Sequence, residues 1–295
     1  MPYDRAKMLS QYRITAPDKF RLKDMKPDDS FGLVISKDEA KDELKEVVKS
    51  IAGKQEMLYA QDQWSLLVIL QAMDAAGKDS VLDNVMSGIN PQGCQVTSFK
   101  TPTSIELDHD WLWRTTVALP ERGRIGVFNR SYYEEVLVVR VHPEILGKQR
   151  VPKALVGKDI WQERFDDIRS FEKHMARNGT KILKFFLNVS KEEQKKRFLE
   201  RIDEADKNWK FNAGDVGERM LWDKYMDAYE DMIRNTSTEH APWFVIPADK
   251  KWFTRLVVAH AMDEALSGLG LAYPKVDAAA LEEMKKAREI LTKEK

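Results

Sequence analysis

A continuous apolar run at residues 64–70 leads directly into a loop that contains Gly77 and Lys78, and this pairing constrains the fold more than any other feature. A strand is apolar along its whole length when helices cover both faces of its sheet. Similar apolar segments predict four further strands, at 95–99, 124–128, 180–189 and 243–246. Helical segments separate these strands, and that alternation is typical of an α/β fold with a parallel sheet flanked by helices.

Periodicity and end signals place the helices. Ser36 and Glu39 form a capping box at the start of a charged helix that continues to about residue 60. A tryptophan-rich helix is predicted over 104–119, closed by Pro120. One helix is predicted to follow the loop and to end at residue 88, another to begin near residue 131, and a third to begin after residue 190. Four further helices are predicted at 160–177, 218–235, 251–266 and 278–295.

A chain of 295 residues can form one large α/β domain or two small ones. No segment rich in Gly, Ser or Pro divides the sequence and no internal repeat is present, so we expect one domain over 1–295. Within it we expect an extended N-terminal arm at 1–35, basic or lid segments near 141–158 and 200–217, and a charged C-terminal helix at 278–295.

Composition excludes several classes of protein. A single cysteine, Cys94, cannot form an intramolecular disulfide framework and suits a reducing compartment. The N-terminal residues show no signal pattern, and the longest apolar run is too short to cross a bilayer. We therefore expect a cytoplasmic protein without a membrane partner.

Charge is balanced overall, with 48 basic and 48 acidic residues, but basic residues outnumber acidic ones between 121 and 201. A basic middle segment can hold an anionic ligand, because the local field matters more than the total charge. The alternative is a set of solvated helix faces. No series of aromatic residues interleaves with these charges, so nucleic acid is not the expected partner.

The segment Ala-Met-Asp-Ala-Ala-Gly-Lys-Asp-Ser at 72–80 has the context of a phosphate-binding loop, between a buried strand and a helix. The backbone amides of Ala75, Ala76 and Gly77 and the helix N-terminus would face one anion. Gly77 permits close approach of the backbone, and Lys78 adds a positive charge. An ordinary turn with a solvated lysine is the alternative interpretation.

The match to the standard phosphate loop is imperfect. Ala72 replaces the first glycine, Asp79 stands at the hydroxyl position, and Ser80 comes one position late. The usual magnesium ligand is therefore missing or replaced. Asp74 is the natural substitute, since magnesium prefers carboxylate and phosphate oxygens.

The third strand ends at Asn129 and Arg130, where the carboxyl edge of a parallel sheet binds ligands. An amide such as Asn129 can orient a metal-bound water, and the planar guanidinium of Arg130 suits a phosphate. A capping or surface role is the alternative for Arg130. Glu134 and Glu135 can equally be favourable first-turn acids of a helix.

Several motifs together resemble the family-2 polyphosphate kinases. Three are Met-Asp-Ala-Ala-Gly-Lys-Asp at 73–79, Phe-Asn-Arg-Ser-Tyr-Tyr-Glu at 128–134 and Lys-Asn-Trp-Lys-Phe at 207–211. Further matching segments lie at 97–100, 112–114, 138–141 and 241–248. The resemblance covers roughly residues 55–270, and the order of unrelated motifs makes it more specific than one loop.

The resemblance implies a P-loop kinase core similar to thymidylate kinase, with a helical lid. It implies phosphoryl transfer between inorganic polyphosphate and AMP or ADP, with magnesium or manganese and with guanine nucleotides as further candidate substrates. Asp74 matches a loop aspartate thought to bind metal and assist catalysis, and Lys78 and Arg130 match phosphate-contacting positions. Asn129 with Glu134 resembles the branch that accepts both AMP and ADP, so Glu134 would help to select the acceptor.

Polyphosphate carries about one negative charge per phosphate unit, so its path must be basic. Arg114 and Arg140 are candidates to hold the acceptor phosphate. The candidates for polyphosphate or lid contacts are Lys148, Arg150, Lys153, Arg197, Arg201, Lys207 and Lys210. A surface charge is the alternative for each residue. We also expect a homo-oligomer.

Two other functions remain open at this stage. An ATP-dependent nucleoside monophosphate kinase would share the loop, the lid and the metal. A nucleotide-binding protein without transfer activity would explain the unusual residues Asp79 and Asn129.

Overall fold

The computed structural model describes residues 3–294 and contains a five-stranded parallel sheet in the order β2-β3-β1-β4-β5. Its strands are β1 (Ser65–Gln71), β2 (Cys94–Ser98), β3 (Ile125–Asn129), β4 (Thr180–Asn188) and β5 (Trp243–Pro247). The predicted fold class, a parallel sheet flanked by helices, is confirmed, and each predicted strand is present.

The apolar run of β1 forms the centre of the sheet, where every one of its residues is buried. Leu70 pairs with Asn129 of β3, and Gln71 pairs with Phe186 of β4. The strands therefore end at the same edge. The loop after β1 and the chain after β3 leave the sheet side by side, as expected for parallel strands.

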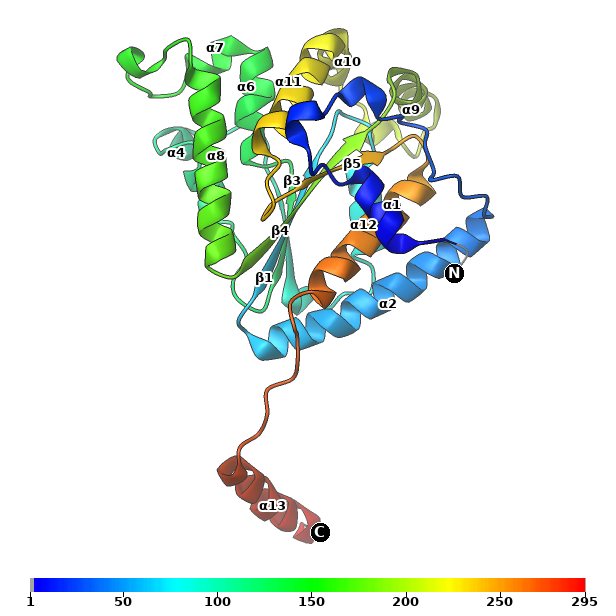
Figure 1. Ribbon diagram of the computed structural model, residues 1–295, viewed down its shortest axis with the longest axis vertical. Helices are drawn as coiled ribbons and strands as arrows, with labels where there is room; N and C mark the ends of the chain where they lie inside the picture. Colours follow the sequence, from blue (N-terminus) through cyan, green and yellow to red (C-terminus); the bar gives the residue numbers. More distant parts are fainter. Residues whose placement is uncertain (1–2, 295) are drawn as a thin grey trace.

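The helices cover both faces of the sheet, with α2 and α12 on one side and α8 and α11 on the other (Figure 1). The α-helices are α1 (Arg5–Tyr12), α2 (Lys37–Gln61), α3 (Lys78–Val85), α4 (Ser104–Leu107), α5 (Trp113–Thr116), α6 (Val138–Val141), α7 (Pro143–Leu146), α8 (Ile160–Arg177), α9 (Lys191–Asp203), α10 (Ala213–Met220), α11 (Trp222–Thr236), α12 (Lys251–Ser267) and α13 (Ala278–Lys293). Six short 3₁₀ turns are also described: η1 (Pro17–Lys19), η2 (Leu22–Asp24), η3 (Pro91–Gly93), η4 (Tyr132–Val136), η5 (Lys153–Leu155) and η6 (Asn208–Lys210).

Local signals explain several helix ends. The predicted capping box of Ser36 and Glu39 starts α2, with both of its reciprocal hydrogen bonds present. The C-terminal helix predicted at 278–295 is observed as α13, which stands away from the rest of the chain in Figure 1. Among the helices within residues 3–294, none has both the length and the apolar character needed to cross a membrane.

The N-terminal arm was predicted to be extended, but part of it is helical. Residues 5–12 form α1, which buries Met8, Leu9 and Tyr12. Beyond α1, the amide of Ile14 donates to the carbonyl of Trp243 in β5. The arm is therefore part of the core, and its short helix lacked the length that makes a periodic pattern visible.

The prediction of a single helix over 104–119 is also wrong. Two one-turn helices, α4 and α5, replace it. Between them the Asp110 carboxylate accepts a hydrogen bond from the amide of Leu112. Short polar side chains that bond nearby amides compete with helical hydrogen bonds, which explains the break.

The structure also differs from the predictions for two further segments. The helix expected from about 131 is the 3₁₀ turn η4 followed by α6 and α7. In the expected loop at 203–217, Asn212 caps the helix α10. These short elements surround the carboxyl edge of the sheet.

Candidate active site

The phosphate loop, residues 72–77, joins the end of β1 to the first residue of α3. Ala75 and Gly77 adopt left-handed backbone conformations, with φ of 60° and 111°. Mixed left- and right-handed residues turn successive amides toward one point and form an anion-binding concavity. Gly77 is needed for its φ, because a side chain there would be strained.

Arg197 of α9 stabilises this loop by hydrogen bonds to its carbonyl groups. Its guanidinium donates to the carbonyls of Ala75 at 3.0 Å and Ala76 at 2.8 Å, and also to those of Ala248 and Asp249. The side chain is buried, at 4% exposure. Arg197 was predicted to contact polyphosphate, and the structure instead engages its guanidinium inside the protein, because the carbonyls of a tightly curled loop need donors.

Lys78 folds back over the loop. Its Nζ donates to the carbonyl of Ala72 at 2.9 Å and contacts that of Met73 at 3.4 Å. Desolvation and the nearby Arg130 guanidinium lower the pKa of Lys78, whereas Asp74 acts in the opposite direction. The Lys78 ammonium therefore lies in a confined site, where a bound anion would stabilise its positive charge.

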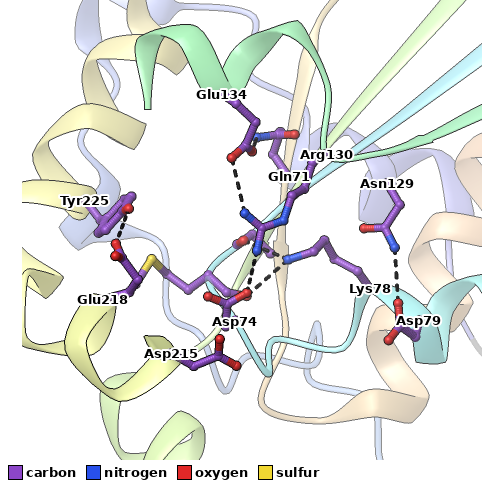
Figure 2. A network of polar contacts seen from close by, with 12 residues as sticks. Gln71, Asp74, Lys78, Asp79, Asn129, Arg130, Glu134, Asp215, Glu218 and Tyr225 are labelled. Atoms are coloured by element: carbon purple, nitrogen blue, oxygen red, sulfur yellow. Dashed lines mark hydrogen bonds and ion pairs between the residues drawn. The ribbon is translucent and has the colours of Figure 1, made fainter. Parts of the chain in front are cut away.

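Asp74, Arg130 and Glu134 form a continuous chain of ion pairs (Figure 2). Arg130 Nη2 lies 2.7 Å from Asp74 Oδ1, and Arg130 Nη1 lies 3.3 Å from Glu134 Oε2. The Gln71 amide donates to the other oxygen of Glu134 at 2.8 Å. Glu134 is the largest cause of a raised pKa at Arg130, so this guanidinium stays charged. The predicted set Asp74, Lys78 and Arg130 converges at one point.

Asp79, Ser80 and Asn129 make contacts within the protein. The Asn129 amide donates to Asp79 Oδ1 at 3.1 Å, which ties β3 to α3. The Ser80 hydroxyl accepts from Arg255 of α12 at 2.7 Å. The two residues that depart from the standard motif, Asp79 and Asn129, are therefore partners of each other.

Asp215 of α10, which was not predicted as a site residue, lies next to Asp74 in Figure 2. Burial raises the pKa of Asp215, and the neighbouring Asp74 charge raises it further. Arg201 offsets this effect from 3.3 Å. An acidic residue in a polar segment gave no signal, because the fold alone brings 74 and 215 together.

Magnesium suits this pair of carboxylates. Within residues 3–294 no cluster of three or more His, Cys, Asp or Glu side chains is arranged to hold a metal. Magnesium at phosphate-transfer sites needs only one or two carboxylates, because substrate phosphates and water complete its coordination. The carboxylate oxygens of Asp74 and Asp215 fit that requirement.

A cavity of about 630 Å³ opens beside Arg130 and Glu134. Among the predicted basic residues, Arg114, Lys148 and Arg150 line it. Its volume lies within the range of small-molecule sites. The Arg114 side chain is 13% exposed and donates to the carbonyl of Lys100 at 2.8 Å.

Arg140 and Lys153 are not among the residues that line the cavity. Arg140 pairs with Asp231 of α11 at 2.6 Å, so it links α6 to α11. Lys153 is exposed on the 3₁₀ turn η5. Glu135, whose role the sequence left open, accepts hydrogen bonds from Arg164 at 3.1 Å and Gln149 at 2.7 Å.

The lid segment, residues 200–217, carries its cations on the surface. Lys207 pairs with Glu204 at 2.7 Å, and the Lys210 ammonium lies 4.9 Å from the centre of the Trp209 ring. Lys251, the first residue of α12, is a further cation that was not predicted to belong to the site. Burial lowers the pKa of Lys251, and its cationic neighbours, including Lys207, lower it further.

Known proteins resemble this chain over most of its length. The family model described as Polyphosphate kinase 2 (PPK2) matches residues 34–269. An ADP-polyphosphate phosphotransferase of Rhodopseudomonas palustris is 53% identical over 88% of this chain and 90% of its own length. An AMP/ADP-polyphosphate phosphotransferase of Meiothermus ruber is 45% identical over 92% and 98%. The crystal structure of polyphosphate kinase 2 from Arthrobacter aurescens matches with a TM-score of 0.85 and 39% identity, covering 97% of each chain.

Proposed function

Because the chain belongs to the polyphosphate kinase 2 family, we propose that it transfers a phosphoryl group between inorganic polyphosphate and adenine nucleotides. The observation that carries this proposal is the convergence of Lys78, Arg130 and Asp74 at the phosphate loop, beside a cavity of nucleotide size. Phosphoryl transfer depends on positioning and charge cancellation more than on covalent chemistry.

The acceptor nucleotide occupies the cavity, with its phosphates toward Arg130 and Arg114. Glu134 stands at the boundary between the cavity and the loop, held by Arg130 and Gln71. From this position Glu134 selects the acceptor, which we propose to be AMP as well as ADP. The name of the Meiothermus ruber relative, which includes both nucleotides, supports this assignment. Guanine nucleotides are a further proposed acceptor.

The polyphosphate donor approaches from the other side of the loop, along the cations of the lid segment and α12. Lys207 and Arg255 are both near enough to Lys251 to lower its pKa. A chain with about one charge per phosphate unit requires such a succession of cations. The carboxylate partners of Lys207, exposed to solvent, can be displaced by phosphate.

Each residue then has a defined task. The loop amides and the Lys78 ammonium hold the phosphoryl oxygens, and the Arg130 guanidinium spans the oxygens that join donor and acceptor. Asp74 and Asp215 would hold magnesium, or manganese, which when bound cancels charge on the phosphate oxygens. Arg197 keeps the loop curled while the substrates exchange.

One assay tests this function. The protein is incubated with magnesium and polyphosphate as sole donor, with AMP in one series and ADP in another. We expect ADP from AMP, ATP from ADP, and no product after chelation of the metal. Turnover with ATP but not with polyphosphate would favour a nucleoside monophosphate kinase. Nucleotide binding without product under either donor would favour a non-catalytic protein.

We also propose that the protein forms homo-oligomers. The isolated helix α13 exposes a set of large apolar side chains, namely Leu281, Met284, Ile290 and Leu291. A second copy of the chain would cover them, since a cluster of exposed apolar side chains is otherwise unfavourable in water. Light scattering of the full chain and of Leu281→Glu tests this, and a monomeric wild type would contradict it.

A further inference from the structure

A fully buried ion pair lies close behind the active site, and nothing described above uses it. Lys184 of β4 and Glu172 of α8 are both at 0% exposure, with Nζ and Oε2 2.7 Å apart. A buried ion pair is weak evidence for stability, because desolvation offsets its attraction. Its presence in the core therefore calls for another explanation.

The hydrogen bonds of this pair are complete. The Lys184 ammonium donates to Glu172, to the Tyr133 hydroxyl at 2.8 Å and to the carbonyl of Thr236 at 2.7 Å. The other oxygen of Glu172 accepts from the hydroxyls of Tyr133 at 2.6 Å and Tyr132 at 2.8 Å. Burial raises the pKa of both tyrosines, so they remain hydroxyl donors at any working pH.

Tyr132 and Tyr133 lie two and three residues after Arg130, with Ser131 between Arg130 and Tyr132. They begin η4, which also carries Glu134. Arg130 has a left-handed backbone with φ of 64°, a conformation that costs a side-chain-bearing residue about 1 kcal/mol or more. Such a residue keeps this conformation only when its surroundings over-determine it.

The surroundings of Arg130 hold it from both ends. On one side its amide donates to the carbonyl of Leu70 in β1 at 3.0 Å. On the other side the buried hydroxyls of Tyr132 and Tyr133 reach the Glu172 carboxylate. Hydrogen bonds to a charged acceptor are about twice as strong as neutral ones, which explains a carboxylate at this place.

We infer that Glu172 and Lys184 are positioning residues, which act through Tyr132 and Tyr133 to aim the Arg130 guanidinium and the Glu134 carboxylate at the substrates. This inference rests on the proposed function and adds residues to it that touch no substrate. Small changes in the orientation of Arg130 and Glu134 should lower the rate, because in-line transfer requires the reacting groups to be closely aligned.

Tyr132→Phe and Tyr133→Phe test the inference, since each removes one hydroxyl and leaves the ring packing in place. We expect kcat to fall at least fivefold in each variant. Tyr12→Phe is the matched control. Tyr12 lies on α1, away from the phosphate loop, and its buried hydroxyl donates to Asp29 at 2.7 Å. Removal of this hydroxyl should leave kcat unchanged.

The double variant Glu172→Gln/Lys184→Met removes both charges together and so avoids leaving one unpaired. We expect it to fold and to lose kcat at least as strongly as the tyrosine variants. If all three variants keep kcat within twofold of wild type while their Tm falls as in Tyr12→Phe, the pair is purely structural and the inference is wrong.

A second readout separates this inference from the proposed function. Hydrogen exchange of the amides at 130–137 should become faster in Tyr133→Phe than in wild type, while exchange in the strands stays unchanged. A wild-type protein without turnover would contradict the function, whereas the exchange rates would still decide whether the network holds this segment. Unchanged exchange at 130–137 would overturn the positioning role.

Discussion

The phosphate loop and the lid segment both bring positive charge to the substrates, but the protein supports them in opposite ways. Arg197 and Arg201 lie one turn apart on α9. Arg197 is buried and bonds loop carbonyls, whereas Arg201 is partly exposed and pairs with Asp215 at 3.3 Å. The loop is held by the core, and the lid segment is held by ion pairs at the surface.

This difference follows from what each region must do. Donors that meet a transferring phosphoryl group work best when they are already in place, because reorganisation would raise the barrier. A lid has to open and close, so its contacts must be weak enough to exchange with substrate. Exposed ion pairs contribute about 0–1 kcal/mol each, which suits that purpose.

The largest effect is expected at the loop itself. Lys78→Ala should lower kcat at least a hundredfold, about 2.7 kcal/mol of barrier, because it removes the ammonium from the phosphate site. Steady-state assays with polyphosphate and ADP measure this. Lys49→Ala, at an exposed position on α2, is the control and should behave as wild type. A folded Lys78→Ala variant with full activity would end the assignment.

An intermediate effect is expected at Arg197, which stabilises the phosphate loop. Arg197→Met should lower kcat about tenfold and the free energy of unfolding by about 2–4 kcal/mol, because two phosphate-loop carbonyls and the carbonyls of Ala248 and Asp249 lose their donor. Thermal unfolding and turnover are measured together. Arg201→Met, one turn along, should lower the Tm by much less than Arg197→Met, because Arg201 is only partly buried and pairs with the single carboxylate of Asp215. Equal losses of Tm in both variants would abolish the contrast between the regions.

The smallest effect is expected at the lid surface. Lys207→Ala should change kcat less than threefold and stability by less than about 0.5 kcal/mol, because its partners are solvent-exposed. Its KM for polyphosphate should rise, and the increase should shrink at high salt because exposed charges are screened. A salt-independent change would mean that Lys207 holds the fold and not the donor.

Much of the site could be predicted because its signals are local. The apolar run at 64–70, the Gly77–Lys78 turn and the capping residues of α2 each act over a few neighbouring positions. In a parallel sheet such signals also imply which strand ends share an edge. The placement of Asp74, Lys78 and Arg130 together follows from that rule, and the structure agrees with it.

The tertiary structure decided what local signals do not contain. The sequence identified Arg197 as a cation but not its burial, and it showed Asp215 only as one acid in a polar segment. It gave no reason to connect Glu172 and Lys184 with Tyr132. These roles depend on which side chains the packed helices bring within about 3 Å, and hydrogen bonds form only at that range. Residue type determines what a side chain can donate or accept, and the fold determines which partner it meets.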